Sequence, residues 1–238
     1  VVDTERGPRF FFDADDGVHG REMWVSDGTS IGTIMLGDME TADAIDWTTE
    51  FTPWMDGAVF TTHGKQGHRM WWTNGSVTTS IWQAPWFSSS TSSDLVNQST
   101  TLSSLGQGLL QGDENGLWFA AKDASVGLEM MFLTATGTLH LYDLQPFGDS
   151  SPSQGLSLED GFVVAASDGT GRQLAKLDHD GGYTWLTSMT KDGTTTPVSV
   201  MAPAFGIELL GDNLVFDVVY RGADATLFTY NLTSGMLQ

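Results

Sequence analysis

An apolar triplet recurs five times along the chain, and this repetition constrains the fold more than any other feature. The triplets are Phe10-Phe11-Phe12, Ala58-Val59-Phe60, Leu117-Trp118-Phe119, Phe162-Val163-Val164 and Leu214-Val215-Phe216. Their last residues lie 48, 59, 45 and 52 positions apart. A period of this size is typical of chains built from four-stranded sheets that stack radially.

A second apolar residue and a glycine follow each triplet at a similar distance. The apolar residues are Met23, Met70, Met130, Leu174 and Leu227, and the glycines are Gly28, Gly75, Gly137, Gly181 and Gly235. An apolar run that ends at Asp-Gly or Asn-Gly favours a hairpin, because glycine adopts the required backbone angles at low cost. No stretch shows a convincing helical period. The sequence therefore predicts an all-β fold, a β-propeller of five four-stranded blades.

The predicted blades divide a single domain, 1–238, into similar lengths. They span 1–48, 49–96, 97–146, 147–198 and 199–238, with a Ser/Thr-rich surface excursion at 85–108 that accounts for the longest interval. Five such sheets can close a ring in which each apolar face packs on the next. The alternative is an open fragment of a larger ring, with further blades missing.

The amino-acid composition excludes several classes of site and of binding partner. The chain has 238 residues, of which 30 are acidic and 10 basic, giving a net charge of −20, and it has no cysteine. Thiolate metal sites, disulfides and cysteine nucleophiles are therefore excluded. The negative field argues against nucleic acid or an anionic membrane as a partner, and no apolar run reaches the roughly 18 residues of a membrane helix. The start at Val1-Val2-Asp3, without Met or a leader pattern, leads us to expect a processed product or an excised fragment.

The stretch FFFDADDGVHGREMWVSDGTSIGT, residues 10–33, resembles the repeat of the ELWxxDGT family. In that family a line such as LFFSADDGxxGxELWxSDGTxxGT recurs along secreted or cell-surface proteins. Here Met23 replaces the leucine of the central motif, and the other copies match only through their period. The resemblance implies the blades of a β-propeller and an extracellular or cell-surface location, but little biochemistry.

Acidic residues gather in the predicted loops between the second and third strands of each blade, which share one face of a propeller. These loops are Asp13–Gly20, Thr61–His68, Lys122–Gly127, Ser167–Gly171 and Val219–Asp224. Carboxylates on flexible loops suit Ca²⁺, which takes six to eight oxygen ligands. Asp13, Asp15 and Asp16 are the candidate Ca²⁺ ligands, and Ca²⁺ is the one cofactor that the sequence suggests. The competing explanation is turn chemistry, since Asp and Gly populate turns for conformational reasons.

Histidines and further acids in these loops add weaker candidates. They are His19, His63, His68, Asp123, Asp168 and Asp224. His63 and His68 flank one loop, but no third ligand lies in register with them, so we expect them to be exposed to solvent.

Tryptophans and glycosylation sequons supply the remaining candidates. Trp24, Trp71, Trp72 and Trp118 lie in predicted strands and are expected to pack between blades, whereas Trp47, Trp54, Trp82, Trp86 and Trp185 lie nearer loops, where exposed rings can stack on sugars. Sequons occur at Asn74, Asn97 and Asn231, with Asn97 in the Ser/Thr-rich excursion. Asn74 also belongs to an Asn-Gly turn, which explains its presence without a glycan.

No catalytic signature is present. We find no nucleophile elbow, zinc-protease helix motif, phosphate loop or dinucleotide motif, and no catalytic residue is assigned. We expect a non-enzymatic extracellular or cell-surface module, adhesive or structural, that contacts a protein or glycan or assembles with itself, without nucleic acid and without membrane insertion. The alternatives are a glycan-binding lectin and a glycoside hydrolase, because paired carboxylates are plentiful although none stands out.

Overall fold

The computed structural model describes residues 1–4, 6–39, 47–48, 51–64, 67–83, 109–123, 125–188, 206–219 and 225–238. Within these ranges the regular structure is strand, with no helix. The described part of the chain accordingly offers no apolar helix of membrane-spanning length. The prediction of an all-β chain is confirmed for these residues.

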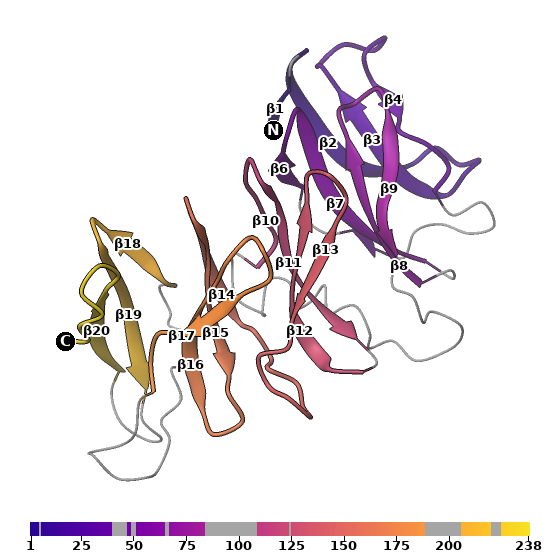
Figure 1. Ribbon diagram of the computed structural model, residues 1–238. Helices are drawn as coiled ribbons and strands as arrows, with labels where there is room; N and C mark the ends of the chain where they lie inside the picture. Colours follow the sequence, from indigo (N-terminus) through magenta and orange to yellow (C-terminus); the bar gives the residue numbers. More distant parts are fainter. Residues whose placement is uncertain are drawn as a thin grey trace. The chain divides into compact units, whose positions relative to one another are not determined.

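The described strands form five antiparallel sheets, named sheet 1 to sheet 5 in chain order (Figure 1). Sheet 1 contains β1 (Val2–Thr4), β2 (Gly7–Asp15), β3 (Arg21–Ser26) and β4 (Ile34–Met35). Sheet 2 contains β5 (Trp47–Thr48), β6 (Thr52–Trp54), β7 (Gly57–Gly64), β8 (Gly67–Thr73) and β9 (Thr78–Gln83). Sheet 3 contains β10 (Gln111–Gly112), β11 (Gly116–Asp123), β12 (Gly127–Thr134) and β13 (Leu139–Tyr142). Sheet 4 contains β14 (Gln154–Leu158), β15 (Gly161–Ser167), β16 (Arg172–Leu177) and β17 (Tyr183–Trp185), and sheet 5 contains β18 (Glu208–Leu210), β19 (Asn213–Val219) and β20 (Ala225–Asn231).

The number of strands per sheet follows the prediction of four with two departures. In sheet 2 the two short strands β5 and β6 both pair with β7, so the first strand position is split. Sheet 5 has three strands, and a bridge between Tyr230 and Leu237 adds a short C-terminal segment beside β20. Thr229 and Gln238 exchange two backbone hydrogen bonds of 2.8 Å in that segment.

The strand register is the same in all five sheets. In each, the last residue of the apolar triplet on the second strand faces the residue that follows the second apolar position on the third strand. The pairs are Phe12 with Trp24, Phe60 with Trp71, Phe119 with Met131, Val164 with Ala175, and Phe216 with Phe228. Because side chains alternate between the two faces of a strand, this register puts equivalent positions on the same face of every sheet. The repeat read from the sequence is thus a repeat of strand register.

The described structure divides into two compact units, one of 1–99 with 112–114 and one of 100–111 with 115–238. In the first unit, one face of sheet 1 packs on sheet 2. Phe11 and Val25 cluster with Ala58, and Met23 clusters with Phe60. Phe11 is the second residue of its triplet, whereas Ala58 and Phe60 are the first and third residues of theirs. Two sheets that stack face to face bring such opposite faces together, because successive side chains of a strand point to opposite sides.

In the second unit, sheet 4 lies between sheets 3 and 5 (Figure 1). The Trp118 ring of β11 stacks on Phe162 of β15 with 5.2 Å between ring centroids. The other face of sheet 4, which includes Val163 and Leu174, clusters with Phe216 of sheet 5. Each face of sheet 4 therefore packs on a different neighbouring sheet.

The expected packing of the four strand tryptophans is confirmed in full only for Trp118, which is fully buried. Trp71 is half-buried and packs beside the cluster of Met23, Met39 and Phe60. Trp24 and Trp72 are also half-buried, and each donates its indole N–H to a backbone carbonyl.

The second apolar position of the repeat is buried in four sheets and exposed in sheet 5. Met23, Met70, Met130 and Leu174 are 0–2% exposed, but the equivalent Leu227 is 69% exposed. In sheets 1 and 4 this position lies on the face that the following sheet covers. Leu227 lies on the face of sheet 5 that points away from sheet 4, and no described sheet follows it. The sequence period fixes the place in the strand, whereas burial depends on what packs against that face.

Candidate functional site

The predicted acidic loop of sheet 1 is shorter than the sequence suggested. Strand β2 continues to Asp15 and β3 begins at Arg21, so Asp13 and Asp15 lie in the strand and not in the loop. The alternation of Phe10, Phe12 and Ala14 with Phe11, Asp13 and Asp15 extends the strand, because period-2 patterning suits a two-faced strand even when one face ends in acids. The other predicted loops shorten in the same way, and those of sheets 2 and 3 begin after Gly64 and Asp123.

The three candidate Ca²⁺ ligands make local contacts. Asp13 forms an ion pair with Arg21 across the strands, with 3.1 Å between Oδ2 and Nη1. Asp15 Oδ1 accepts a hydrogen bond of 2.7 Å from the backbone N–H of Gly17. Asp16 Oδ1 accepts from the N–H groups of Val18 and His19 at 2.9 and 2.8 Å. These bonds are the Asx-turn contacts that let Asp shape a turn without any ligand.

Asp16 also binds the side chain of His19, whose Nδ1 lies 2.7 Å from Asp16 Oδ2. The hydrogen bond from the His19 backbone, with that from its ring, lowers the pKa of Asp16 to about 2. The same ring contact raises the pKa of His19 above its ordinary value. Both groups are exposed, so the pair stabilises the turn only modestly.

The described residues contain no group of three or more His, Asp or Glu side chains placed to hold a metal ion. In sheet 2, β7 pairs His63 with His68 across the strands. Asp123 ends β11, and Asp224 lies outside the described residues. The calcium site at Asp13, Asp15 and Asp16 remains a prediction.

Calorimetric titration with Ca²⁺ tests that prediction directly. A site at the β2–β3 turn predicts saturable heat with the native protein and its loss in Asp16→Asn, because the amide removes one anionic ligand while keeping an acceptor for the turn. The absence of heat at millimolar Ca²⁺ would leave these carboxylates with their role in the turn alone.

The tetrapeptide Ser-Asp-Gly-Thr occurs twice and builds the same turn in two different places. Between β3 and β4, Asp27 Oδ1 accepts from the backbone N–H and the hydroxyl of Thr29 at 3.0 and 2.7 Å. Between β15 and β16, Asp168 Oδ1 accepts from the same two groups of Thr170, both at 2.7 Å. The intervening glycines have φ of 89° and 87°, a left-handed conformation that glycine tolerates best. The motif is therefore a self-contained turn.

We expect Asp168→Ala to lower the free energy of unfolding by about 1–2 kcal/mol, because three donors lose their acceptor at once. The third donor is the Gly171 N–H, 2.8 Å from Asp168 Oδ1. Urea denaturation measures the loss. Asp168→Asn is the matched control, since it keeps Oδ1 as an acceptor, and an equal loss in both variants would contradict this account of the turn.

The described sequons are engaged in turns. Asn74 Oδ1 accepts from the N–H groups of Ser76 and Val77 at 3.1 and 3.0 Å. Asn231 donates its amide N–H₂, the group that a glycan would modify, to Asn213 Oδ1 at 3.0 Å. Asn97, with the rest of the Ser/Thr-rich excursion, lies outside the described residues. Glycosylation at these positions remains a prediction.

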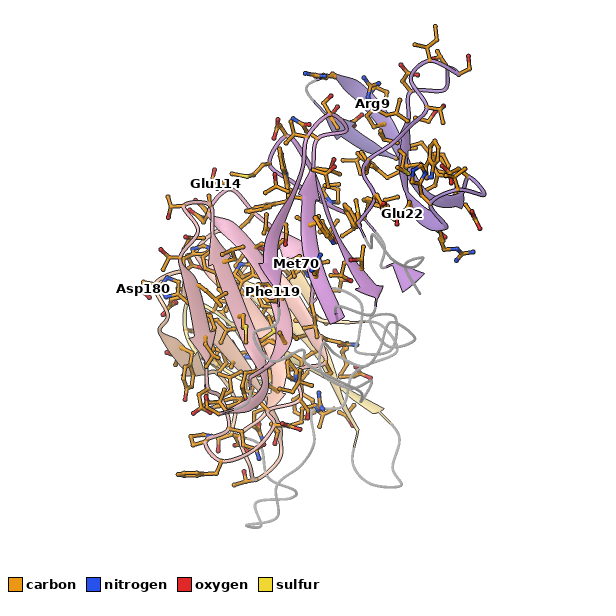
Figure 2. All side chains as sticks on the ribbon, turned by 90° about the vertical axis from the view of Figure 1, so that its right-hand side faces the viewer. Arg9, Glu22, Met70, Glu114, Phe119 and Asp180 are labelled. Atoms are coloured by element: carbon orange, nitrogen blue, oxygen red, sulfur yellow. The ribbon has the colours of Figure 1, made fainter. Side chains whose placement is uncertain are left out.

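Sequence reasoning missed a set of buried polar side chains that precede the second apolar position of the repeat. Glu129 is fully buried, and its carboxylate accepts from the backbone N–H groups of Leu144 and Ser150 at 3.0 and 2.9 Å. Glu22, at the equivalent place in sheet 1 (Figure 2), accepts from the N–H of Met39 at 3.1 Å. In sheet 4 the equivalent is Gln173, which accepts from the Thr187 hydroxyl at 2.9 Å. The shared place of these residues in the repeat, just before Met23, Met130 and Leu174, is the signal that could have identified them.

Burial raises the pKa of Glu129 to about 7, while the hydrogen bonds from Ser150 and Leu144 oppose that shift. A raised carboxyl pKa is often a sign of an active site. Here both oxygens are hydrogen-bonded to the segment that leads from β13 to β14. The position and bonding of Glu129 fit a structural tether between successive sheets.

The outer face of sheet 1 is the surface that the sequence did not single out. We use this name for the face of β2, β3 and β4 opposite Phe11, Met23 and Val25, and it carries Pro8, Phe10, Phe12, Ala14, Trp24 and Met35. The Phe10 and Phe12 rings stack with 5.4 Å between centroids. Phe10 is 54% exposed, and Phe12, Trp24 and Met35 are half-buried. An exposed aromatic face of this kind is typical of an interaction surface.

Comparisons with known proteins find structures with a similar fold but no matching family. No protein-family model matches the chain, and no curated protein matches it. A crystal structure of the S511A mutant of puromycin hydrolase complexed with PGG is similar, with a TM-score of 0.52 and 13% identity over 92% of this chain. A second crystal structure of puromycin hydrolase has a TM-score of 0.51 and 14% identity over 92% of this chain. The structure of a Mycobacterium tuberculosis puromycin-hydrolyzing peptidase covers 99% of this chain and 36% of its own, with 10% identity and a TM-score of 0.49.

The chain spans 32% of the length of both puromycin hydrolase chains. These neighbours are β-propeller proteins. At such low identity the likeness concerns the fold alone, and it agrees with the repeated antiparallel sheets described above.

Proposed function

We propose that this chain is a β-propeller module whose five sheets are successive blades, and that it acts outside the cell or at its surface without catalysis. In this role it binds a protein or glycan, or assembles with further copies. The proposed location, outside the cell or at its surface, rests on the resemblance of residues 10–33 to the ELWxxDGT repeat.

The outer face of sheet 1 is the observation that carries the proposal. It offers stacked Phe10 and Phe12 rings and the half-buried Trp24 ring on one rigid face. Aromatic side chains contribute a large apolar area at low conformational cost, which suits them to contact surfaces. Because these rings are carried by paired strands, little conformational entropy is lost when a partner binds to them.

The candidate chemical groups support a binding role in preference to catalysis. Asp16, Asp27 and Asp168 hold turns through their own backbone neighbourhoods. Glu129, the described carboxyl with the raised pKa of about 7, is fully buried and tethers the chain between sheets. Asp16 is exposed beside His19, but its two oxygens are engaged within the turn by the N–H groups of Val18 and His19 and by the His19 ring.

The test compares binding with turnover for the same purified chain. Surface plasmon resonance against immobilised cell-surface polysaccharide and envelope-protein fractions is expected to show saturable binding. Assays with puromycin, aminoacyl amides and chromogenic glycosides are expected to show no hydrolysis. Turnover that is lost on replacing a single carboxylate would overturn the proposal, and so would the absence of binding to either fraction in a chain that also does not self-associate.

A further inference from the structure

The buried side chain of Glu129 holds both ends of a short strap. We use this name for residues 145–149, which lie in the connection from β13 to β14. Glu129 is fully buried, and its two carboxyl oxygens accept hydrogen bonds from the backbone N–H groups that flank the strap. These donors are Leu144, at 3.0 Å, and Ser150, at 2.9 Å. One carboxyl group therefore fixes where the strap begins and where it ends.

The strap lies on two turns, one in sheet 3 and one in sheet 4. Asp149 Oδ1 accepts from the N–H of Leu128 at 2.9 Å. A Cβ atom on Gly127 would come within 2.3 Å of the same oxygen, so the strap lies directly on the β11–β12 turn. At the other side, a Cβ atom on Gly169 of the β15–β16 turn would lie 3.6 Å from Cγ of Gln145. The strap thus bridges the two turns.

Backbone strain opposes this closed position. Phe147, in the strap, has a φ of 74°, and Ser151, just after it, has a φ of 46°. Residues other than glycine adopt this left-handed region at a cost, and they stay there only where surrounding contacts hold them. The Phe147 side chain is fully exposed and adds no packing to hold the strap. The bonds to Glu129 are two of the contacts that keep the strained backbone in place.

An ionised Glu129 is unfavourable in the closed position. The charged residues on the elements around it are Lys122 and Asp123 at the end of β11, Asp143 after β13, Asp149 on the strap, and Asp168 and Arg172 at the β15–β16 turn. Burial, and to a smaller extent the charge of Asp143, raise the pKa of Glu129 to about 7. Asp168 is bonded within its own turn, and Arg172 donates to the Ala165 carbonyl. Contact with water would return the pKa of Glu129 towards its ordinary value, so ionisation favours a state in which the strap has moved away.

We propose that the strap is a pH-sensitive latch, closed on Glu129 while that side chain is neutral and open once it is ionised. The closed state retains a proton that the open state has lost, so raising the pH shifts the population towards the open state. Opening uncovers Leu144 and Ser150, which are 2% and 0% exposed in the closed state. The latch belongs to sheets 3 and 4 and goes beyond the proposed function, since it operates whatever partner the module binds.

Amide hydrogen exchange measured by NMR tests the latch, because the Leu144 and Ser150 N–H groups exchange only when they leave Glu129. After correction for the intrinsic exchange rate, the protection of Ser150 is expected to fall by up to about 300-fold as the pH rises from about 4.5 to about 7, the ratio that corresponds to the raised pKa. In Glu129→Gln the protection is expected to be independent of pH. The same independence in the native protein would overturn the proposal.

Val163 supplies the reference for global unfolding, since it is fully buried in the middle of sheet 4. The Ser150 amide is expected to exchange faster than that of Val163 at every pH, because the strap opens while the sheets stay folded. Equal protection of the two amides throughout would show that Glu129 reaches water only when the whole unit unfolds. That result would overturn the latch.

A spin label at position 147 supplies a second measurement. The chain has no cysteine and Phe147 is fully exposed, so Phe147→Cys can be labelled at one site without disturbing the core. The mobility of the label is expected to rise over the same pH range, and adding Glu129→Gln is expected to abolish the rise. Ala135→Cys, on the exposed β12–β13 turn, is the matched control and is expected to show no change. An equal rise at both labelled positions, or a rise that survives Glu129→Gln, would overturn the proposal.

Discussion

Replacing Trp118 with alanine is expected to lower the free energy of unfolding by about 3–5 kcal/mol, the usual cost of removing a large aromatic ring from a core. Trp118 is fully buried in sheet 3. Its ring lies 4.2 Å from that of Phe132 and 5.2 Å from that of Phe162 of sheet 4, measured between centroids. The substitution therefore opens a cavity between two sheets. Urea or guanidinium denaturation followed by fluorescence measures the loss.

Trp185→Ala is the matched control for that prediction. Trp185 lies in the short edge strand β17, is half-buried, and makes an edge contact with Tyr183. Its loss is expected to cost about 1 kcal/mol. Equal losses in the two variants would contradict the assignment of Trp118 to the contact between sheets 3 and 4.

The free energy of unfolding of the native protein is expected to fall, relative to that of Glu129→Gln, as the pH rises from about 4.5 to about 7. Burial raises the pKa of Glu129 from 4.5 to about 7 in the folded protein. Between these values the folded state retains a proton that the unfolded state has lost, so raising the pH favours unfolding. The effect is on the order of 3 kcal/mol across the window. It is present only in the native protein, because glutamine does not titrate.

Denaturation at a series of pH values with both proteins measures this difference. Every other carboxylate is common to the two chains and cancels in the comparison. The glutamine amide also places its N–H₂ against one of the backbone donors of Leu144 and Ser150, which adds a loss that does not depend on pH. The slope is therefore the diagnostic quantity, and a constant difference between the two proteins would contradict the raised pKa.

The register of the sheets could be predicted from the sequence because it depends on local patterns. The triplets lie on the second strands, and Met23, Met70, Met130 and Leu174 lie buried on the third strands, as their spacing predicts. Leu227 shows the limit of that reasoning, since its position in β20 is as expected but its face is uncovered. Periodicity along a strand specifies which residues share a face and gives no information on what packs there.

The candidate site was less predictable because it depends on contacts between distant residues. A glutamate beside an apolar run, as at Glu129, suggests an exposed position until the backbone of Leu144 and Ser150 is placed beside it. The acids of the β2–β3 region suggested a cation site, but their oxygens meet Arg21 and nearby N–H groups. The outer face of sheet 1 was hidden within a run of three phenylalanines, since only the strand register separates Phe11 from its exposed neighbours.

An experimental structure of the purified chain in solution conditions, by crystallography or electron microscopy, tests the central claim most directly. The claim is that the five sheets are successive blades of a β-propeller. If the claim is right, the structure will show the five sheets stacked radially in chain order. Two sheets packed face to face as a single sandwich would contradict it.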